Sequence, residues 1–482
     1  MSTERQQHAF HSKIVQTKSA SAARNGPTRR APHHSLAVEF RETVDLAVPI
    51  VLTQAGQIAM MTTDLAFIAR TGAEGVAAAA LAGRLYLMSV MFGVGLLTPI
   101  APLAAQAFGA DNLPMVRRSL RMGLLAALLL SIPITASALF GEQILLALSQ
   151  EPAAARLAQQ YLFGLAWGVA PALWFQAIRN LMSAVKRPQP VWWITLAAVP
   201  VNAVLVYILV YGKLGLPRLE LFGAGLATTL VNCGTFLTVL WVATMHRPFR
   251  DYHVLAHFWR FNWPLMRQLV LTGTPNSVTY LVRYALSSAA VLLAGRISTR
   301  AIVAHQIASQ VAAFLALIPL GISTAASVRV SHAAGRRDGP GIRLAGLVAI
   351  VLGFVTTVML TIAVIAARMP IAKFLLGESA GDADATIRLA GELLLAGASY
   401  FVTDATQWIA AASLRGLKDT RVPLLFAVIA QWLIGLPISY ILGLKMGLGA
   451  VGIWIGLSIG ATIYAGLLVQ RFLLLANGRS CN

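Results

Sequence analysis

Long apolar runs recur along nearly the whole chain, and they constrain its fold more than any other feature of the sequence. Each is about 20 residues or longer, the length that an α-helix needs to cross the hydrocarbon core of a bilayer. Of the 482 residues, 57% are hydrophobic and only 12% are charged, which leaves too little polar surface for several soluble domains. Twelve such runs lie near residues 44–68, 80–107, 119–141, 159–184, 190–211, 221–245, 265–293, 301–328, 342–367, 391–413, 422–443 and 449–475. The sequence therefore predicts an all-α integral membrane protein with twelve transmembrane helices.

The charge of the chain follows from this topology. Lys and Arg number 38 against 18 Asp and Glu, for a formal net charge of +20. In a soluble chain this excess would indicate a nucleic-acid partner, whereas in a membrane protein Lys and Arg concentrate in cytoplasmic loops. When the N-terminus is placed in the cytoplasm, most of the basic residues outside the runs fall on the inner side. We therefore expect both termini in the cytoplasm, the lipid bilayer as the surroundings and no nucleic-acid partner.

The chain resembles itself at an offset of about 226 to 233 residues. The segment LAAQAFGAD, which ends at Asp111, aligns with RVSHAAGRRD, which ends at Asp338, and Pro49 aligns with Pro275. Two pseudo-symmetric six-helix bundles follow, an N-lobe over residues 41–245 and a C-lobe over residues 265–475. Because six is even, both halves cross the membrane in the same direction, and parallel repeats of this kind are typical of transporters with a site between the halves.

Three segments lie outside the two lobes. Residues 1–40 are basic and lack an apolar run, which predicts a disordered cytoplasmic tail, although an organellar transit peptide has a similar composition. Residues 246–264 alternate bulky apolar residues with Arg and His, which predicts a cytoplasmic interfacial helix. In that segment His253 and His257 stand four apart, but no acidic residue completes a zinc pattern, so we expect no metal site. Residues 476–482 form a short C-terminal tail.

Two acidic residues, Asp64 and Asp404, lie well within apolar runs. A carboxylate in the membrane costs several kcal/mol unless it is paired or protonated, so such a residue is a functional candidate by default. Polar residues, together with Met61, share a helix face with each Asp or lie on other runs: Gln54, Gln57 and Met61 with Asp64, Tyr400 and Gln407 with Asp404, and Asn202, Tyr280, Arg283 and Gln306 elsewhere. These residues predict a polar cavity between the helices, although single Gln or Ser side chains can also serve only to hold helices together.

A desolvated carboxylate can carry a proton, and together with amide and hydroxyl oxygens it can instead hold a small hard cation. Either use requires the carboxylate to meet water from one side of the membrane at a time, which is ion-coupled alternating access. We therefore expect H⁺ or Na⁺ as the coupling ion, and no catalytic residues and no cofactor.

Several segments resemble the multidrug and toxic compound extrusion (MATE) family, in its bacterial NorM-type branch. The most specific are residues 301–338, which contain AHQIA, and DATQWIAAASLRGLKDTRVP at residues 404–423; residues 46–72, 92–110 and 200–215 add weaker matches. The resemblance implies two six-helix lobes arranged as a V and the export of cationic or amphipathic compounds by H⁺ or Na⁺ antiport. It also implies a monomer in the bacterial inner membrane.

By the same resemblance, Asp64 is the carboxylate of the N-lobe, with Asn202 nearby, Asp404 is the coupling carboxylate of the C-lobe, and Gln306 belongs to the family-like stretch. One position departs from the branch, which usually carries Glu eight residues after the proline of its GxP motif. Counting from Pro275 gives Arg283. A cation there can pair with Asp404 and occupy the place of Na⁺, so we expect weakened Na⁺ binding in the C-lobe and proton coupling through Asp64.

Three other functions remain open at this point. A lipid-linked oligosaccharide flippase of the same superfamily shares the two-lobe plan, but it needs a strongly cationic cavity, and only Arg283 and Arg179 are candidates. A membrane-embedded transferase would need a clustered catalytic set, and the lone His305 has no acidic neighbour in the sequence. A channel or receptor fits carboxylates in both halves of a repeat less well than an ion-coupled transporter does.

Overall fold

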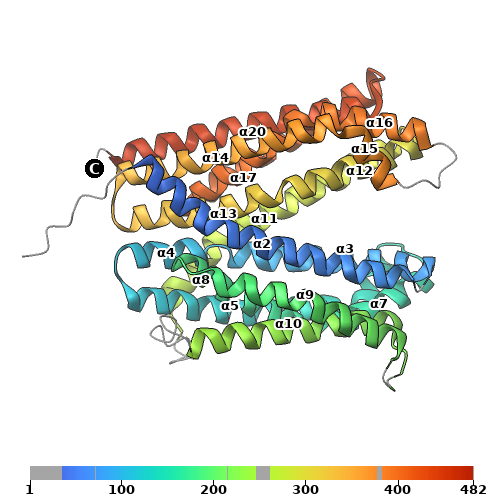
Figure 1. Cartoon of the computed structure of the whole chain (residues 1–482), viewed down its shortest axis with the longest axis horizontal. Coiled ribbons are helices and arrows are strands. Elements are labelled where there is room, and N and C mark those ends of the chain that lie inside the picture. Colours follow the sequence, from blue (N-terminus) through green and yellow to red (C-terminus); the bar gives the residue numbers. More distant parts are fainter. Residues whose placement is uncertain are drawn as a thin grey trace, which may run out of the picture.

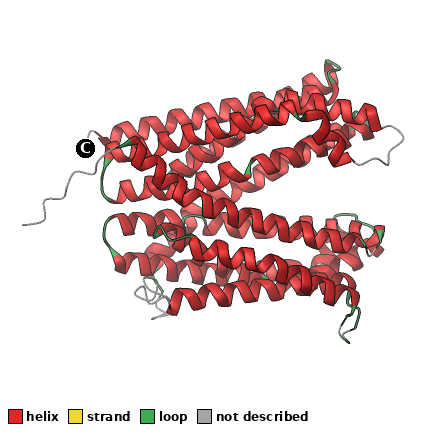
Figure 2. Ribbon diagram, viewed as in Figure 1, coloured by secondary structure: helices red, strands yellow, loops and turns green. Residues whose placement is uncertain are grey.

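The computed structural model describes residues 35–70, 72–213, 215, 217–245, 261–376 and 383–480, and the regular structure within these ranges is helical throughout (Figure 2). The first half contains α2 (Leu36–Ala69), α3 (Ala73–Leu97), α4 (Ile100–Gly109), α5 (Leu113–Leu139), α6 (Gly141–Ala147), α7 (Pro152–Ala166), α8 (Val169–Ala184), α9 (Gln189–Tyr211) and α10 (Glu220–Met245). The second half contains α11 (Trp263–Gly295), α12 (Thr299–Leu315), α13 (Leu317–Gly335), α14 (Gly339–Ala366), α15 (Arg368–Leu376), α16 (Ala383–Ala396), α17 (Ala398–Gly416), α18 (Arg421–Ala427), the π-helical η2 (Val428–Gly435), α19 (Leu436–Tyr440), the π-helical η3 (Ile441–Lys445) and α20 (Gly449–Ser480).

Within the described residues, ten helices are long and apolar enough to cross a membrane. Two further pairs, α7 with α8 and α16 with α17, each make one broken span, bent by 49° and 47°. With both pairs counted the spans number twelve, at the places that the apolar runs predict. The fold is therefore an all-α membrane protein, as the sequence predicts.

Four of the predicted spans are broken in the structure, at matching places in the two halves. The second and eighth spans divide into α3 with α4 and α12 with α13, and the fourth and tenth are the two bent pairs. Pro99, which lacks a backbone N–H, lies at the first break, and Gly168 and Gly397 lie at the bends. The broken helices follow the repeat that the sequence predicts: α4 ends at Gly109 and α13 at Gly335, which is an offset of 226 residues.

Both tail boundaries differ from the sequence prediction. The first helix begins at Leu36, so residues 36–40 are helical and not disordered, because Glu39 is held there by an ion pair with Arg329 of the other lobe. The last helix runs to Ser480 and includes most of the predicted tail, since the apolar pattern continues through residues 472–476. Residues 1–34 and 246–260, and with them His253, His257 and most of the predicted interfacial helix, lie outside the described residues.

The helices form two lobes that lie side by side, α2–α10 and α11–α20 (Figure 1). The first helix of each half leans on the other lobe, because α2 packs against α13 and α14 while α11 packs against α3 and α5. The lobes are closest at the end where α4, α8, α13 and α17 finish, which is also the end that carries Leu36 and Ser480. We refer to this end as the closed end.

Small residues permit the close approach of the lobes. A Cβ atom on Gly95 of α3 would come within 2.6 Å of the Cα atom of Ser277 on α11, and one on Gly273 would collide with the backbone of Leu96. The hydroxyl of Ser277 donates to the carbonyl oxygen of Phe92 (2.7 Å). Closely packed small residues and hydrogen bonds of this kind hold helices together where lipid removes the hydrophobic driving force.

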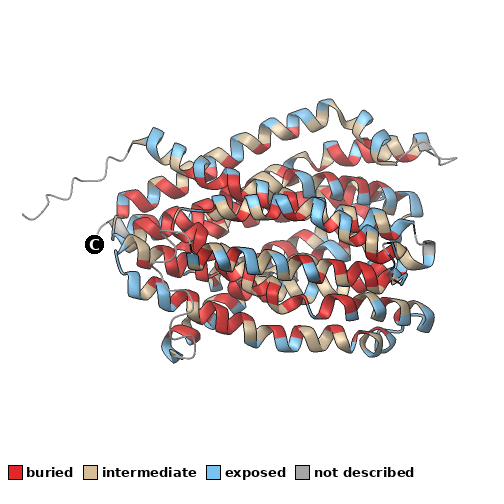
Figure 3. Cartoon of the chain, turned by 60° about the horizontal axis from the view of Figure 1, so that its bottom comes forward, coloured by how far each residue is buried: buried red, intermediate tan, exposed pale blue. Residues whose placement is uncertain are grey.

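The outer faces of the helices are apolar and exposed, as a surface in contact with lipid requires. Buried residues concentrate where helices face one another, while exposed and intermediate residues follow the outside of the bundle (Figure 3). On α14 the exposed side chains include Phe354, Met359 and Ile362.

Candidate functional site

Asp64 lies in the N-lobe on α2, and only 8% of it is exposed. Its Oδ1 accepts a hydrogen bond from Asn202 Nδ2 of α9 (2.5 Å), and its Oδ2 accepts one from Thr228 Oγ1 of α10 (3.1 Å). Both donors are neutral. The structure therefore brings Asn202 to Asp64 and adds Thr228, but these contacts leave the carboxylate charge uncompensated.

The two glutamines of the same helix face a different partner. Arg179 of α8 donates from Nη2 to Gln54 Oε1 (2.9 Å) and from Nη1 to Gln57 Oε1 (3.2 Å). At 1.5 Å of rise per residue, Gln57 lies about 10 Å along α2 from Asp64. The polar stripe that the sequence predicts on this helix is therefore divided between two sites.

Asp404 lies in the C-lobe on α17 and forms an ion pair with Arg283 of α11, as its place in the sequence suggests. Arg283 Nη2 is 2.5 Å from Asp404 Oδ1, which also accepts a hydrogen bond from Gln407 Nε2 (2.5 Å). The indole N–H of Trp408 donates to Oδ2 (3.2 Å), and the Arg283 guanidinium lies 4.5 Å from the centre of the Trp408 ring. Both oxygens of Asp404 therefore accept hydrogen bonds, and its charge is neutralised by a guanidinium.

Gln407 extends this cluster into the interior of the C-lobe. Its Oε1 accepts a hydrogen bond from Gln431 Nε2 of η2 (3.0 Å), and only 1% of Gln407 is exposed. Gln407, itself held by Gln431, thus donates to the Asp404 oxygen that pairs with Arg283, and this hydrogen bond helps to orient the carboxylate.

A cavity of about 440 Å³ lies between the lobes. It is lined by Gln54, Leu87, Met91, Val94, Tyr280, Arg283, Tyr284, Leu286, Ser287, Ala290, His305, Ser309, Ala312, Leu320, Tyr400, Trp408, Gln431, Trp454 and Leu457. Five aromatic side chains, from α11, α17 and α20, line the cavity together with one guanidinium, that of Arg283. This lining suits a flat amphipathic molecule, because ring faces offer apolar contact and the polar groups fix its orientation.

Four of the residues that the sequence predicts for the cavity do line it: Gln54, Tyr280, Arg283 and Tyr400. Gln57 and Gln407 are not among the lining residues; Gln57 binds Arg179, and Gln407 binds Gln431. Met61 is also absent from the lining and is 66% exposed. Gln306 is exposed, and its neighbour His305 lines the cavity instead, with Nδ1 accepting a hydrogen bond from Trp454 Nε1 (3.1 Å). These four side chains lie outside the lining of this cavity; a step of one residue along a helix turns a side chain by about 100°, to another face.

A cluster of charged side chains joins the two lobes at the closed end. Arg329 of α13 contacts Glu39 of α2 with two nitrogens and also contacts Glu42, which accepts a hydrogen bond from Lys186 Nζ (2.6 Å). Arg329 is 4% exposed. The pKa of Lys186 is lowered overall, because burial and the nearby Arg336 outweigh the effect of Glu39, which raises it. His332 Nε2 adds a hydrogen bond to the carbonyl oxygen of Ala184 across the lobes (2.7 Å).

Among the described residues, no group of three or more His, Cys, Asp or Glu could hold a metal ion. A Na⁺ ion would need free oxygen ligands, and the oxygens of Asp404 are already engaged by Arg283, Gln407 and Trp408.

The sequence pattern did not identify Thr228, the contacts of Arg179, or the role of Trp408 and Gln431. A threonine in an apolar helix commonly donates to a backbone carbonyl of its own helix, so Thr228 does not stand out in the sequence. Its Oγ1 does lie 3.2 Å from the carbonyl oxygen of Ala224. The only signal for Arg179 is its position inside an apolar run, which marks a charge that needs a partner without naming it.

The protein-family model MatE matches residues 49–208 and residues 275–441, one segment in each half. A relative in Bradyrhizobium diazoefficiens, named "Probable multidrug resistance protein NorM", is 56% identical over 450 residues, which cover 93% of this chain and 96% of the relative. A protein of the same name in Rhodopseudomonas palustris is 48% identical over 90% of this chain and 91% of its own length.

Solved structures agree on the fold. One described as an outward-facing conformation of a multidrug resistance MATE family transporter has a TM-score of 0.83, at 19% identity over 92% of this chain and 97% of its own. The eukaryotic MATE transporter AtDTX14 has a TM-score of 0.80, at 20% identity over 91% of this chain and 96% of its own. The chain therefore belongs to the MATE family, in its bacterial NorM-type branch, and is a membrane transporter and not an enzyme.

Proposed function

We propose that this protein is a secondary active multidrug efflux transporter of the bacterial inner membrane, which exports organic cations and other amphipathic compounds in exchange for protons. It works as a monomer with both termini in the cytoplasm, and the exchanged proton is carried by Asp64. The observation that carries this proposal is the difference between the two membrane carboxylates: Asp64 has neutral donors, whereas Asp404 has a guanidinium.

A buried carboxylate with neutral donors is relieved of its desolvation cost when it binds a proton. Protonation also changes what Asp64 can do, since the oxygen that binds the proton becomes a donor. The Thr228 hydroxyl can then accept from Asp64 and donate to the carbonyl oxygen of Ala224, whereas the Asn202 amide still needs an acceptor oxygen. The contacts of α2 with α9 and α10 therefore differ between the two protonation states. A ligand shifts a conformational equilibrium only through such a difference, so Asp64 has the property that coupling requires.

Asp404 has a different role in this proposal. Its ion pair with Arg283 keeps the cavity wall close to neutral, and the Arg283 guanidinium lies over the face of the Trp408 ring. A neutral, aromatic wall supports the binding of flat amphipathic cations and neutral compounds. The same wall argues against the flippase, because Arg283 is the only Lys or Arg in the lining and is already neutralised.

The lobes have an arrangement that supports alternating access. They are joined by Arg329, Glu39 and Glu42 at the closed end and diverge toward the opposite end (Figure 1). With the termini in the cytoplasm, this is the outward-facing state. The transition to the inward-facing state would require the contacts of Arg329 with Glu39 and Glu42 to break.

The direct test is transport by purified protein in proteoliposomes with a fluorescent cationic dye. Either a pH gradient is imposed in sodium-free buffer, or a Na⁺ gradient is imposed at equal pH. We expect the pH gradient alone to drive dye movement, and Asp64→Asn to abolish it while the protein keeps its monodisperse elution. Transport that needs Na⁺ and ignores the pH gradient would contradict proton coupling.

A further inference from the structure

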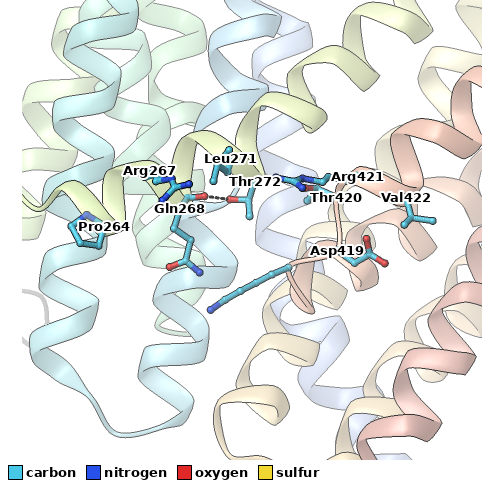
Figure 4. Close-up of a pocket in the computed structure, with 10 residues that line it drawn as sticks. Pro264, Arg267, Gln268, Leu271, Thr272, Asp419, Thr420, Arg421 and Val422 are labelled. Carbon is cyan, nitrogen blue, oxygen red and sulfur yellow. Dashed lines mark hydrogen bonds between the residues drawn. The ribbon is translucent and has the colours of Figure 1, made fainter.

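A second cavity, of about 490 Å³, lies at the closed end and is separate from the cavity between the lobes. It is lined by the first turns of α11, by the loop after α17 and by the start of α18: Pro264, Arg267, Gln268, Leu271, Thr272, Lys418, Asp419, Thr420, Arg421 and Val422. In Figure 4, Arg421 extends from the start of α18 toward α11, where Arg267 and Gln268 lie.

The lining of this cavity is cationic. Arg267, Lys418 and Arg421 contribute three positive charges, and Asp419 is the one carboxylate among the lining residues. Asp419 is engaged elsewhere, because its Oδ2 accepts a hydrogen bond from Arg471 Nε of α20 (3.0 Å). The cavity therefore suits an anionic group.

The N-lobe counterpart of this place shows what has changed in the C-lobe. The offset of 226 that relates Pro49 to Pro275 relates Arg41 to Arg267 and Glu42 to Gln268. It also places Asp45 opposite Leu271. In the N-lobe both acids form ion pairs with basic neighbours, Glu42 with Lys186 and Asp45 with Arg41.

The basic residue of the loop is kept in both halves. Lys186 follows α8 and Lys418 follows α17, and both have the same left-handed backbone, with φ of 60° and 65°. The C-lobe has thus kept the cations of this motif and has lost two carboxylates, to the amide of Gln268 and the apolar side chain of Leu271.

The surroundings of the cavity place it at the depth of lipid headgroups. Trp263, 65% exposed, and Phe261 stand at the start of α11, where membrane proteins carry their interfacial aromatic residues. Exposed apolar side chains border the cavity, with Leu271 of its lining on α11 and Leu425 further along α18. A cationic cavity is therefore continuous with a surface that acyl chains can cover.

We propose that this cavity binds the phosphate headgroup of an anionic phospholipid, such as phosphatidylglycerol, from the adjacent leaflet. Arg267 and Arg421 contact the phosphate oxygens, for which the planar guanidinium is well matched, and the acyl chains lie along Leu271 and Leu425. A free phosphate ion shares the headgroup chemistry but makes no use of the apolar surface. The proposal does not depend on the transported compound or on the coupling ion.

The test is native mass spectrometry of the full-length protein in detergent, titrated with phosphatidylglycerol or with phosphatidylcholine of the same acyl chains. We expect selective binding of phosphatidylglycerol. Gln268→Glu restores the carboxylate of the N-lobe without a change of size, and Arg421→Gln removes a cation. Each should weaken phosphatidylglycerol binding about fivefold, since one basic residue near a lipid surface contributes ~1 kcal/mol.

Arg41→Gln, at the matching place in the N-lobe, is the control and should leave phosphatidylglycerol binding unchanged. Phosphatidylcholine binding and the melting temperature should be the same in all variants, which separates the loss of a charge from misfolding. Equal binding of the two lipids, or unchanged phosphatidylglycerol binding in both C-lobe variants, would overturn the proposal. So would complete displacement of the lipid by millimolar inorganic phosphate, which would identify a simple anion site.

Discussion

The two lobes repeat one architecture but treat a membrane carboxylate in opposite ways. In the N-lobe, Asp64 lies between an amide and a hydroxyl, and the cation Arg179 is bound to two glutamine oxygens instead. In the C-lobe the cation and the acid are together, with Arg283 on Asp404. The comparison teaches that an acid inside an apolar helix does not have a fixed function, because its partner decides whether it can exchange a proton.

The position of the arginine explains how the repeat diverged. Arg283 of α11 corresponds at an offset of 226 to Gln57 of α2, which accepts its hydrogen bond from Arg179 of α8. Each lobe therefore links its first span to its fourth through one arginine. In the N-lobe this link consists of neutral acceptors, which leaves Asp64 outside it.

The largest effect is expected from Asp64→Asn. The amide keeps the size of the side chain and removes the titratable group, so we expect proton-driven dye efflux to fall to the level of cells without the protein. Efflux is measured at equal expression in cells, with Asp45→Asn on the exposed first part of α2 as the control. If Asp64→Asn exports like the wild type, the proposed difference between the lobes is broken.

The next largest effect separates charge neutralisation from coupling in the C-lobe. Asp404→Asn alone leaves the Arg283 guanidinium unpaired, and breaking a buried pair costs about 3–5 kcal/mol. We expect a lower melting temperature and at least tenfold weaker efflux. The double variant Asp404→Asn with Arg283→Met should recover most of both, because it removes the whole pair. A double variant as inactive as the single one would make Asp404 a coupling residue like Asp64.

A smaller effect is expected at the closed end. Arg329→Gln removes the contacts with Glu39 and Glu42 that join the lobes. Loss of one partner of a buried charge pair costs about 2 kcal/mol or more, which shifts the equilibrium toward the inward-facing state by roughly 30-fold. Spin labels at positions 113 and 343 of a variant without native cysteines should report a longer distance.

Arg41→Gln is the matched control for Arg329→Gln, because its ion pair with Asp45 joins two exposed side chains of the same helix. Distances that respond equally to both substitutions would show that the cluster around Arg329 does not hold the lobes together.

The smallest effect concerns the aromatic wall of the cavity. Trp408→Leu removes the ring beneath Arg283 and the N–H that reaches Asp404. We expect about fivefold weaker dye binding in a fluorescence titration, consistent with ~1 kcal/mol for a partly desolvated cation–π contact. Trp241→Leu, on the exposed face of α10, should bind the dye normally. Equal loss in both variants would argue against a specific role for Trp408.

Much of the fold could be predicted from the sequence, because membrane helices are long and apolar. The runs indicated all twelve spans, and the aligned segments around Asp111 and Asp338 indicated the repeat. The bends at Gly168 and Gly397 were not predicted, since hydropathy averages over a break of one or two residues. The helical start at Leu36 was missed for a different reason, namely that its stability comes from the contact between Glu39 and the distant Arg329.

The site was less predictable. Asp64 and Asp404 stand out because charges are rare in apolar runs, and the exchange at Arg283 indicated its ion pair. Whether a neutral side chain reaches the cavity depends on the rotation of its helix and on side chains from other spans. Gln306 and His305 are adjacent in sequence, yet only His305 reaches the cavity.

The most direct measurement is the number of protons released when a cationic dye binds to the purified, weakly buffered protein in sodium-free solution. Because the proposed exchange requires the dye to displace the proton of Asp64, we expect the wild type to release protons and Asp64→Asn to release none. The double variant Asp404→Asn with Arg283→Met should release as many as the wild type. Proton release that persists in Asp64→Asn and disappears in the double variant would contradict the assignment of the proton to the N-lobe.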